Sequence, residues 1–218
     1  MARLIAIGDV HGYTLALRAL LDWVAPTRDD TLVFLGDYVD RGPDSRGTLD
    51  LLIELQQSLQ VVPLLGNHDH LFAEICTGRL DLRDEWLRFG GAQTVASYGR
   101  VPEDVPAAHL AFLAGCPRYY ETEHHFFVHA NYDARTPIAG LPGALLLWQS
   151  LRDRLPGPHY SGKVAVVGHT AQKTGRILDL GYLKCIDTYL YGGGALTALN
   201  LTSSELWQVD QSGQRRPT

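Results

Sequence analysis

Five short runs of the chain are apolar at nearly every position and rich in branched residues. They span residues 3–7, 31–35, 61–65, 126–130 and 163–167. Such a run is typical of a strand that is covered on both faces, because neither face then holds a polar side chain. The pattern therefore predicts five buried strands.

Apolar residues recur at helical spacing in the two segments that separate the first three strands. Residues 14–25 place Leu15 and Trp23 on one face of an expected helix, with the 3.6-residue period of a surface helix. Residues 45–59 form the second such segment, with Ser45 as the expected N-cap. The resulting β-α-β-α-β order predicts a parallel sheet with helical crossovers.

The second half of the chain has a different pattern. Residues 182–187, 195–201 and 205–210 are short strand-like runs at close spacing, and we expect them to form an antiparallel meander. Residues 71–125 favour helices and loops without a strong motif, which we interpret as a cap region over the site. We expect residues 1–218 to form a single domain.

Composition and charge narrow the classes of protein. Hydrophobic residues make up 45% of the 218 residues and charged residues 20%, as in ordinary globular proteins. The net charge of -5 argues against non-specific nucleic-acid binding, which needs a positive field to collect phosphates. We expect no nucleic-acid partner.

Nothing in the sequence indicates a membrane or a disulfide framework. The first residues lack the long apolar core of a signal peptide, and no apolar run approaches the roughly 20 residues that span a bilayer. Cys76, Cys116 and Cys185 are odd in number and have no C-x-x-C spacing. We expect buried thiols, a cytoplasmic location and no membrane association.

Polar side chains with metal-binding or proton-transfer chemistry follow or end all five predicted strands. These residues are Asp9, His11, Asp37, Asp40, Arg41, Asn67, His68, His129 and His169. Sites in open parallel sheets form outside the carboxyl ends of the strands. Each motif alone is weak, and a histidine on an apolar strand is usually a hydrogen-bonded core residue. Their recurrence at every strand end favours one common site.

The donor types indicate which ions the site would hold. Aspartate, asparagine and histidine form an oxygen and nitrogen set without thiolate, which suits manganese, iron or zinc better than calcium. Six such donors are too many for one ion and suit two ions that share a carboxylate, an arrangement that clamps phosphoryl groups. The guanidinium of Arg41 adds a forked donor that matches phosphate.

The motifs resemble those of a known family. The chain resembles the phosphoprotein phosphatase branch of the calcineurin-like metallophosphoesterases, of the bacteriophage lambda phosphatase kind, at GDVHG (8–12), GDYVDRG (36–42), GNHD (66–69), VHA (128–130) and GHT (168–170). Residues 186–199 are similar to the segment that closes those proteins, except that Tyr189 stands in place of a glycine. The resemblance implies an α/β fold in which a β-sandwich is flanked by helices.

The resemblance also implies roles for the site residues. Two divalent ions, with manganese favoured and iron or zinc as alternatives, would be held by Asp9, His11 and Asp37 and by Asp37, Asn67, His129 and His169. A metal-bridging hydroxide would be the nucleophile. His68 would be the general acid, oriented by Asp40, and Arg41 would bind phosphate.

Three departures from the family pattern concern phosphate binding and substrate. Leu65 and Ser150 stand where arginines are expected, and Arg152 and Arg154 are the candidate replacements. Asp69 stands where the protein phosphatases have glutamate. The symmetrical diadenosine tetraphosphate hydrolases have aspartate at this position. We expect Asp69 to be a supporting residue at a helix start, and His70, which follows it, to be an ordinary first-turn side chain.

Three functions remain open at this point. We expect first a dinuclear metal-dependent phosphomonoesterase that acts as a serine/threonine protein phosphatase. The alternative is a symmetrical diadenosine tetraphosphate hydrolase or a related nucleotide pyrophosphohydrolase; the acid partner Asp40 argues against it and Asp69 for it. The third is a non-catalytic phosphoprotein-binding module. The partner would thus be a phosphorylated protein or a small phosphoester, and the oligomeric state stays open.

Overall fold

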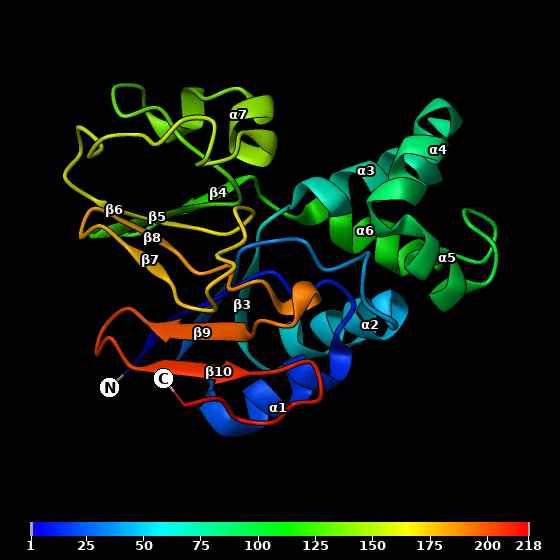
Figure 1. The fold of residues 1–218 in the computed structure, drawn as a ribbon, viewed down its shortest axis with the longest axis horizontal. Helices are drawn as coiled ribbons and strands as arrows, with labels where there is room; N and C mark the ends of the chain where they lie inside the picture. The colour runs from blue at the N-terminus through cyan, green and yellow to red at the C-terminus, as the bar shows by residue number, and fades with distance from the viewer. Residues whose placement is uncertain (1, 218) are drawn as a thin grey trace.

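The computed structural model describes residues 2–217 as two five-stranded sheets flanked by helices (Figure 1). The first sheet has the order β10-β9-β1-β2-β3 and the second the order β4-β5-β6-β8-β7. The strands of the first sheet are β1 (Leu4–Ile7), β2 (Thr31–Phe34), β3 (Gln60–Pro63), β9 (Leu196–Asn200) and β10 (Leu206–Val209). Those of the second are β4 (Tyr119–Glu121), β5 (His125–Val128), β6 (Val164–Val167), β7 (Leu178–Asp179) and β8 (Leu183–Cys185). This is the expected α/β architecture of a β-sandwich flanked by helices.

The five predicted strands are present, and the first three are parallel. β1 pairs with β2 in the register Ile5 to Leu32, and β2 pairs with β3 in the register Leu32 to Val61. The crossovers are α1 (Thr14–Val24) and α2 (Ser45–Gln56). The carboxyl ends of β1, β2 and β3 therefore lie along one edge.

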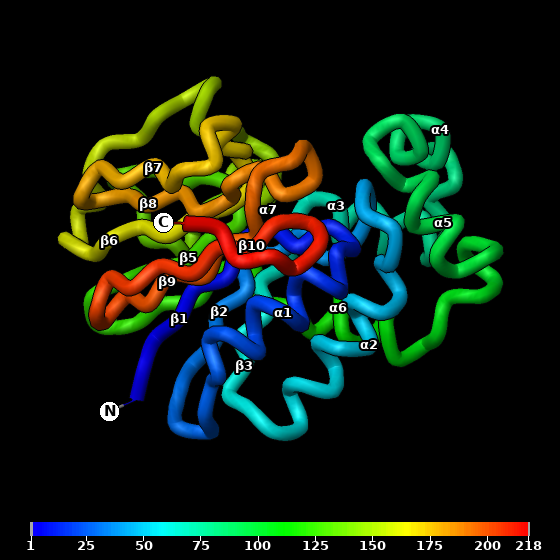
Figure 2. Tube along the Cα trace, turned by 60° about the horizontal axis from the view of Figure 1, so that its bottom comes forward, coloured from blue at the N-terminus to red at the C-terminus, as the bar shows by residue number. Residues whose placement is uncertain are grey.

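Two details of the predicted helices are wrong. Leu15 is 63% exposed, and α1 buries the neighbouring face, which packs against β9 and β10 (Figure 2). Its buried apolar residues are Ala16, Leu17, Leu20, Leu21 and Val24. The N-cap of α2 is Asp44 instead of Ser45, because the Asp44 carboxylate accepts a hydrogen bond from the backbone of Gly47 at 2.8 Å.

The predicted antiparallel meander is also wrong, because its strands belong to different sheets. β8 pairs in parallel with β6 and antiparallel with β7 in the second sheet. β9 and β10 form an antiparallel hairpin that extends the first sheet beside β1. The chain crosses from one sheet to the other between Cys185 and Leu196. Apolar side chains from both sheets, including Ala6, Val33 and Phe127, fill the space between them.

Residues 67–115 form a helical layer on the side of α2 (Figure 1). Its elements are α3 (Asn67–Cys76), the 3₁₀ turn η1 (Leu80–Leu82), α4 (Arg83–Trp86), the π turn η2 (Leu87–Gly91), α5 (Ala92–Tyr98) and α6 (Ala107–Gly115). Later in the chain come η3 (Ile138–Gly140), α7 (Gly143–Trp148) and η4 (Leu190–Gly192). Within residues 2–217, no helix is both long and apolar enough to cross a membrane. Cys116 and Cys185 are buried thiols as predicted, and Cys76 is half-buried.

Candidate functional site: a metal centre at the strand ends

The structure brings the predicted site residues together in the loops that follow β1, β2, β3, β5 and β6. Seven of them are buried: Asp9, His11, Asp37, Asp40, Asn67, His68 and His129. Arg41 and His169 are half-buried. Several carboxylates and imidazoles thus lie at one edge of the sandwich with little access to water.

Backbone strain is concentrated in these loops. The non-glycine residues with positive φ within residues 2–217 are His11, Ala25, Asp37, Asp40, Arg41, His169, Tyr189 and Ser204. Five of these eight are predicted site residues. The left-handed region costs a non-glycine residue about 1–3 kcal/mol and persists only where the surroundings enforce it. The fold therefore fixes these side chains in particular directions.

The tautomers of three histidines follow from their hydrogen bonds. The Nδ1 atoms of His11 and His129 lie 3.0 Å from Val39 O and 2.7 Å from Leu35 O. The Nε2 of His169 lies 3.1 Å from the carbonyl oxygen of Trp148. A carbonyl only accepts, so each of these nitrogens carries the proton and the other ring nitrogen is an acceptor. Metal-binding histidines show this arrangement.

Two of these acceptor nitrogens face oxygens that are also acceptors. The amide oxygen of Asn67 lies 2.9 Å from the Nε2 of His129 and 2.9 Å from the Nδ1 of His169. The Nε2 of His129 is also 3.4 Å from a carboxylate oxygen of Asp37. Acceptors that face each other are unfavourable unless a cation lies between them. This donor set fits the expected second metal.

The set expected for the first metal is less compact. The Nε2 of His11 lies 3.6 Å from the second carboxylate oxygen of Asp37, so Asp37 has one oxygen on each side. A compact group of possible ligands consists of His11, Asp37 and His68, while the other consists of Asp37, His129 and His169. Asp9 belongs to neither group; its carboxylate accepts from the backbone of His169 at 3.0 Å.

The charges of the site favour bound cations. Burial, together with the nearby charges of Asp187 and Asp37, raises the pKa of Asp9 well above its usual value. Burial and then the neighbouring His129 lower the pKa of His169 to about 4. Burial also lowers the pKa of His11. A divalent metal binds ionised carboxylates and neutral imidazoles. A bound cation would offset the repulsion between these carboxylates, and the imidazoles are already neutral.

Asp187 is a further candidate site residue, close enough for its charge to act on Asp9, and the sequence predicted no role for it. It is 3% exposed, and burial raises its pKa to about 6. Asp187 lies in the segment IDT (186–188), which contributes to the family resemblance. The aspartate after the apolar β8 run was the signal that could have identified it.

His68 and Asp40 form the predicted pair. The Nδ1 of His68 lies 2.7 Å from Oδ2 of Asp40. Burial lowers the pKa of His68, but the charge of Asp37 and the bond to Asp40 outweigh it and raise the pKa above its usual value. A raised pKa suits a proton donor.

Arg41 connects this pair to the candidate metal ligands. Its two terminal nitrogens lie 2.8 Å from the Nε2 of His11 and 2.8 Å from the Nε2 of His68. The contact with His68 needs an unprotonated Nε2, since guanidinium only donates. The acid form of His68 therefore requires Arg41 to turn away, and a phosphate oxygen would be its new acceptor.

Asp69 lies where a supporting residue was expected. It is fully buried, and its carboxylate accepts from the backbone of Asp37 at 2.7 Å, Tyr38 at 2.8 Å and Gly66 at 3.0 Å. It thus joins the loops after β2 and β3. Gly66 must stay small, because an added Cβ would lie 2.2 Å from the Asp37 carboxylate. His70 is half-buried and lies outside both compact groups of possible ligands.

The two candidate replacement arginines differ in position. Arg154 forms an exposed ion pair with Asp133 at 2.8 Å, so its charge is already matched. Arg152 donates to the carbonyl of Ala171, and its charge opposes the rise in the pKa of Asp187. Of the two arginines, Arg152 is therefore the one whose charge acts on a buried carboxylate near the candidate site.

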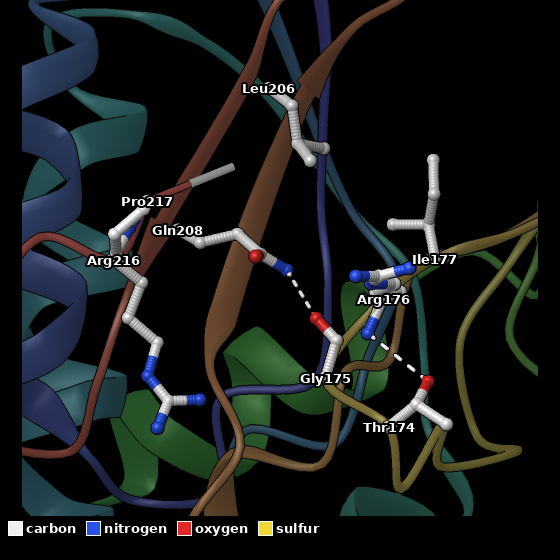
Figure 3. Close-up of a pocket in the computed structure, with 8 residues that line it drawn as sticks. All are labelled: Thr174, Gly175, Arg176, Ile177, Leu206, Gln208, Arg216 and Pro217. Carbon is white, nitrogen blue, oxygen red and sulfur yellow. Dashed lines mark hydrogen bonds between the residues drawn. The ribbon is translucent and has the colours of Figure 1, made fainter.

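The cavity beside His68 is small and mainly apolar. It has a volume of about 250 Å³ and is lined by Arg41, Asn67, His68, Leu71, Phe89 and Trp148. Phe89 comes from the expected cap region and is 54% exposed. A cavity of about 720 Å³ lies elsewhere, lined by the loop at 174–177, β10 and the C-terminal segment (Figure 3). It contains none of the predicted site residues.

A family model described as calcineurin-like phosphoesterase matches residues 2–193. The chain belongs to the calcineurin-like phosphoesterases. A symmetrical bis(5'-nucleosyl)-tetraphosphatase of Cellvibrio japonicus is 32% identical over 157 residues, which cover 71% of this chain and 53% of the relative. A protein of the same name from Burkholderia pseudomallei is 46% identical over 70 residues, or 32% of this chain and 24% of the relative. This phosphoesterase thus spans about half the length, or less, of the curated relatives it matches.

Solved structures with the same fold carry several functional names. A putative diadenosine tetraphosphatase has a TM-score of 0.73 at 21% identity, covering 95% of this chain and 93% of that one. A cold-active protein-tyrosine phosphatase of a psychrophilic Shewanella has a TM-score of 0.67 at 17% identity, covering 99% and 80%. A serine/threonine phosphatase of Saccharomyces cerevisiae has a TM-score of 0.59 at 14% identity, covering 92% and 73%. These likenesses support the phosphoesterase fold of this chain and do not distinguish among the substrates.

Proposed function

We propose that this phosphoesterase hydrolyses symmetrical dinucleoside tetraphosphates such as diadenosine tetraphosphate. The observation that carries the proposal is the 32% identity over 71% of the chain to a relative named for that reaction. Asp69, the residue type of the diadenosine branch, supports it. The proposal replaces the serine/threonine phosphatase that the sequence analysis placed first, since the relatives favour the alternative.

The site supplies what a phosphoryl transfer to water needs. Asp9, His11, Asp37, Asn67, His129 and His169 would hold two divalent ions, whose chemistry would be to polarise phosphoryl oxygens and supply a nucleophile at neutral pH. Arg41 would bind non-bridging oxygens and stabilise the charge that develops on them. His68 would hold a proton at Nε2 for the leaving oxygen, with its imidazole oriented by Asp40 through Nδ1.

A second candidate is a phosphomonoesterase, and the contact between His68 and Asp40 favours it. An alkoxide is a poor leaving group and needs a proton, whereas a nucleoside diphosphate leaves more readily. The small apolar cavity beside His68 also suits a compact leaving group. The non-catalytic module is the least favoured function, because the candidate ligands, the acid pair and Arg41 are all present at one edge.

Product analysis tests the proposal. Diadenosine tetraphosphate is incubated with the Mn²⁺-loaded protein, and the nucleotides are separated by ion-exchange chromatography. Symmetrical cleavage adds one water between the second and third phosphates and yields only ADP. Formation of ATP and AMP, or no turnover while a phosphoserine peptide is hydrolysed, would contradict the proposal. Asp37→Asn, which removes the shared carboxylate, is the inactive control.

A further inference from the structure

Asp40 is a buried carboxylate that three side chains hold at once. Besides His68, the indole Nε1 of Trp86 donates to both of its oxygens, at 2.9 and 3.0 Å. The hydroxyl of Thr94 donates to Oδ1 at 2.6 Å. Asp40, Trp86 and Thr94 are all fully buried, so solvent does not compete for these bonds. Trp86 and Thr94 belong to the helical layer, in which sequence reasoning found no motif.

The helical layer also holds the backbone of the loop that contains Asp40 and Arg41. Asp40 and Arg41 have φ values of 72° and 69°, so two consecutive non-glycine residues are left-handed. The hydroxyl oxygen of Thr94 accepts from the backbone N–H of Asp40 at 3.0 Å. The carbonyl of Gly90 accepts from the N–H of Arg41 at 3.0 Å. These bonds stabilise a conformation that the two residues would rarely adopt alone.

Two glycines allow this close approach. Gly90 has a φ of 113°, and an added Cβ would lie 2.6 Å from the Cγ of Arg41. A Cβ on Gly91 would lie 2.3 Å from the ring of Trp86. Both glycines lie in η2, where the chain kinks between α4 and α5 and Gly90 departs from helical geometry. The segment from Trp86 to Thr94 therefore packs closely against Asp40 and Arg41.

We propose that Trp86 and Thr94 are positioning residues for the acid pair of this enzyme. They keep the Asp40 carboxylate in the orientation that aligns the imidazole of His68 with the leaving oxygen. The proposal rests on the acid role of His68 given under the proposed function.

Each Asp40 oxygen has two donors, so the loss of Thr94 or Trp86 as a donor leaves at least one oxygen in the core with a single donor, and Asp40 rotates toward the donors that remain. Proton donation then weakens. Phosphate binding through Arg41 is retained, because the N–H of Asp40 also donates to the hydroxyl of Ser45 at 3.1 Å and the N–H of Arg41 keeps the carbonyl of Gly90.

Leaving-group dependence tests this role. Thr94→Val removes the hydroxyl with little change in shape, and Trp86→Phe removes the indole N–H. General acid catalysis contributes about 10²- to 10⁴-fold, so partial misalignment should lower kcat on an alkyl phosphate about ten-fold. On p-nitrophenyl phosphate, whose leaving group needs little protonation, the loss should stay within about three-fold, with KM unchanged on both.

Matched variants separate positioning from general damage to the fold. Thr94→Ser keeps the hydroxyl and should recover most of the alkyl phosphatase activity. Thr48 is also fully buried, but its hydroxyl donates to the backbone carbonyl of Asp44 at 3.1 Å. Thr48→Val should therefore change both activities equally. Circular dichroism verifies folding, and if Thr94→Val does not fold, Trp86→Phe and Thr94→Ser carry the test.

His68→Asn distinguishes failure of this proposal from failure of the acid role. If His68→Asn loses far more activity on the alkyl than on the aryl ester, but Thr94→Val and Trp86→Phe lose both equally, the positioning role is overturned and the acid role stands. Equal losses in His68→Asn overturn both. A wild-type protein that hydrolyses the aryl but not the alkyl ester also overturns both. Hydrolysis of diadenosine tetraphosphate to ADP is measured separately and tests the proposed function by itself.

Discussion

The guanidinium carbon of Arg41 lies 3.9 Å from the centre of the Tyr191 ring. The same ring is 5.2 Å from the ring of His11 and 4.7 Å from that of Tyr189, in edge-to-face contacts. Tyr191 comes two residues after Tyr189. Tyr189 has a left-handed backbone and stands where the family resemblance implies a glycine. Arg41, the proposed phosphate-binding residue, is thus supported by an aromatic residue from the loop between the two sheets.

We expect Tyr191→Leu to weaken phosphate binding. A cation–π contact of this kind contributes about 0.5–2 kcal/mol, so KM should rise about two- to thirty-fold with a smaller change in kcat. Tyr191→Phe keeps the ring and should behave like the wild type. Tyr160, which is 62% exposed and lies elsewhere, provides the control variant Tyr160→Leu. A loss in Tyr191→Phe as large as in Tyr191→Leu would assign the effect to the hydroxyl instead.

Arg41→Lys should impair catalysis although it keeps the charge. Lysine lacks the fork that contacts two acceptors at once, here His11 and His68 at 2.8 Å each. Removal of one donor to a developing oxyanion typically costs about 10²- to 10³-fold in kcat, and we expect a loss of about that order. The measurement is steady-state kinetics with saturating Mn²⁺. Near-wild-type kcat would show that Arg41 does not contact the transferred phosphoryl group.

Removal of metal should abolish activity and lower thermal stability. The facing acceptors of Asn67 and His129, 2.9 Å apart, are unfavourable without a cation. Excess chelator should therefore inactivate the protein, and added Mn²⁺ should restore activity. A ligand at 100 times its Kd adds about 2.7 kcal/mol of stability, which calorimetry detects as a raised Tm. Full activity after verified metal removal would contradict the dinuclear site.

Asp30 provides a test of stability away from the site. It is 2% exposed, and the hydrogen bond from Arg3 holds the pKa of Asp30 well below its usual value. A lowered pKa stabilises the fold above the unfolded value of about 3.9, and this stabilisation is lost as the pH falls below it. Asp30→Asn should therefore lower the free energy of unfolding by about 2 kcal/mol at pH 7. The difference from wild type should shrink below about pH 4.

Urea titrations at a series of pH values measure this effect. Asp29→Asn, at an exposed neighbouring position, is the control and should have little effect. A constant difference between Asp30→Asn and wild type from pH 7 to pH 3 would show that the charge of Asp30 does not matter.

Sequence reasoning predicted the strands and the site edge because both depend on local patterns. Buried parallel strands are continuous apolar runs, and the polar groups after them meet at the carboxyl edge by topology alone. This is why residues as distant as Asp9 and His169 could be placed in one site. The backbone N–H of His169 donates to the carboxylate of Asp9 at 3.0 Å, so the two residues do lie together.

The errors arise where tertiary packing decides. β8 and the β9–β10 hairpin look alike in sequence, but they belong to different sheets. Asp44 caps α2 because the helix begins at Ser45, and Asp44 is the non-helical residue immediately before it. Trp86 and Thr94 were missed because an indole and a hydroxyl in an amphipathic segment look like ordinary core residues. Only their contacts with Asp40, 46 and 54 residues away in the chain, indicate a further role.

Substrate preference distinguishes a dinucleotide hydrolase from a protein phosphatase, and it is measured by comparing two substrates on one preparation. The Mn²⁺-loaded protein is assayed in parallel on diadenosine tetraphosphate and on a phosphoserine peptide. We predict kcat/KM at least about ten-fold higher for the dinucleotide, which corresponds to about 1.4 kcal/mol of transition-state preference. We also predict no turnover of either substrate in Asp37→Asn. A higher kcat/KM for the phosphopeptide would contradict the proposal and restore the protein phosphatase alternative.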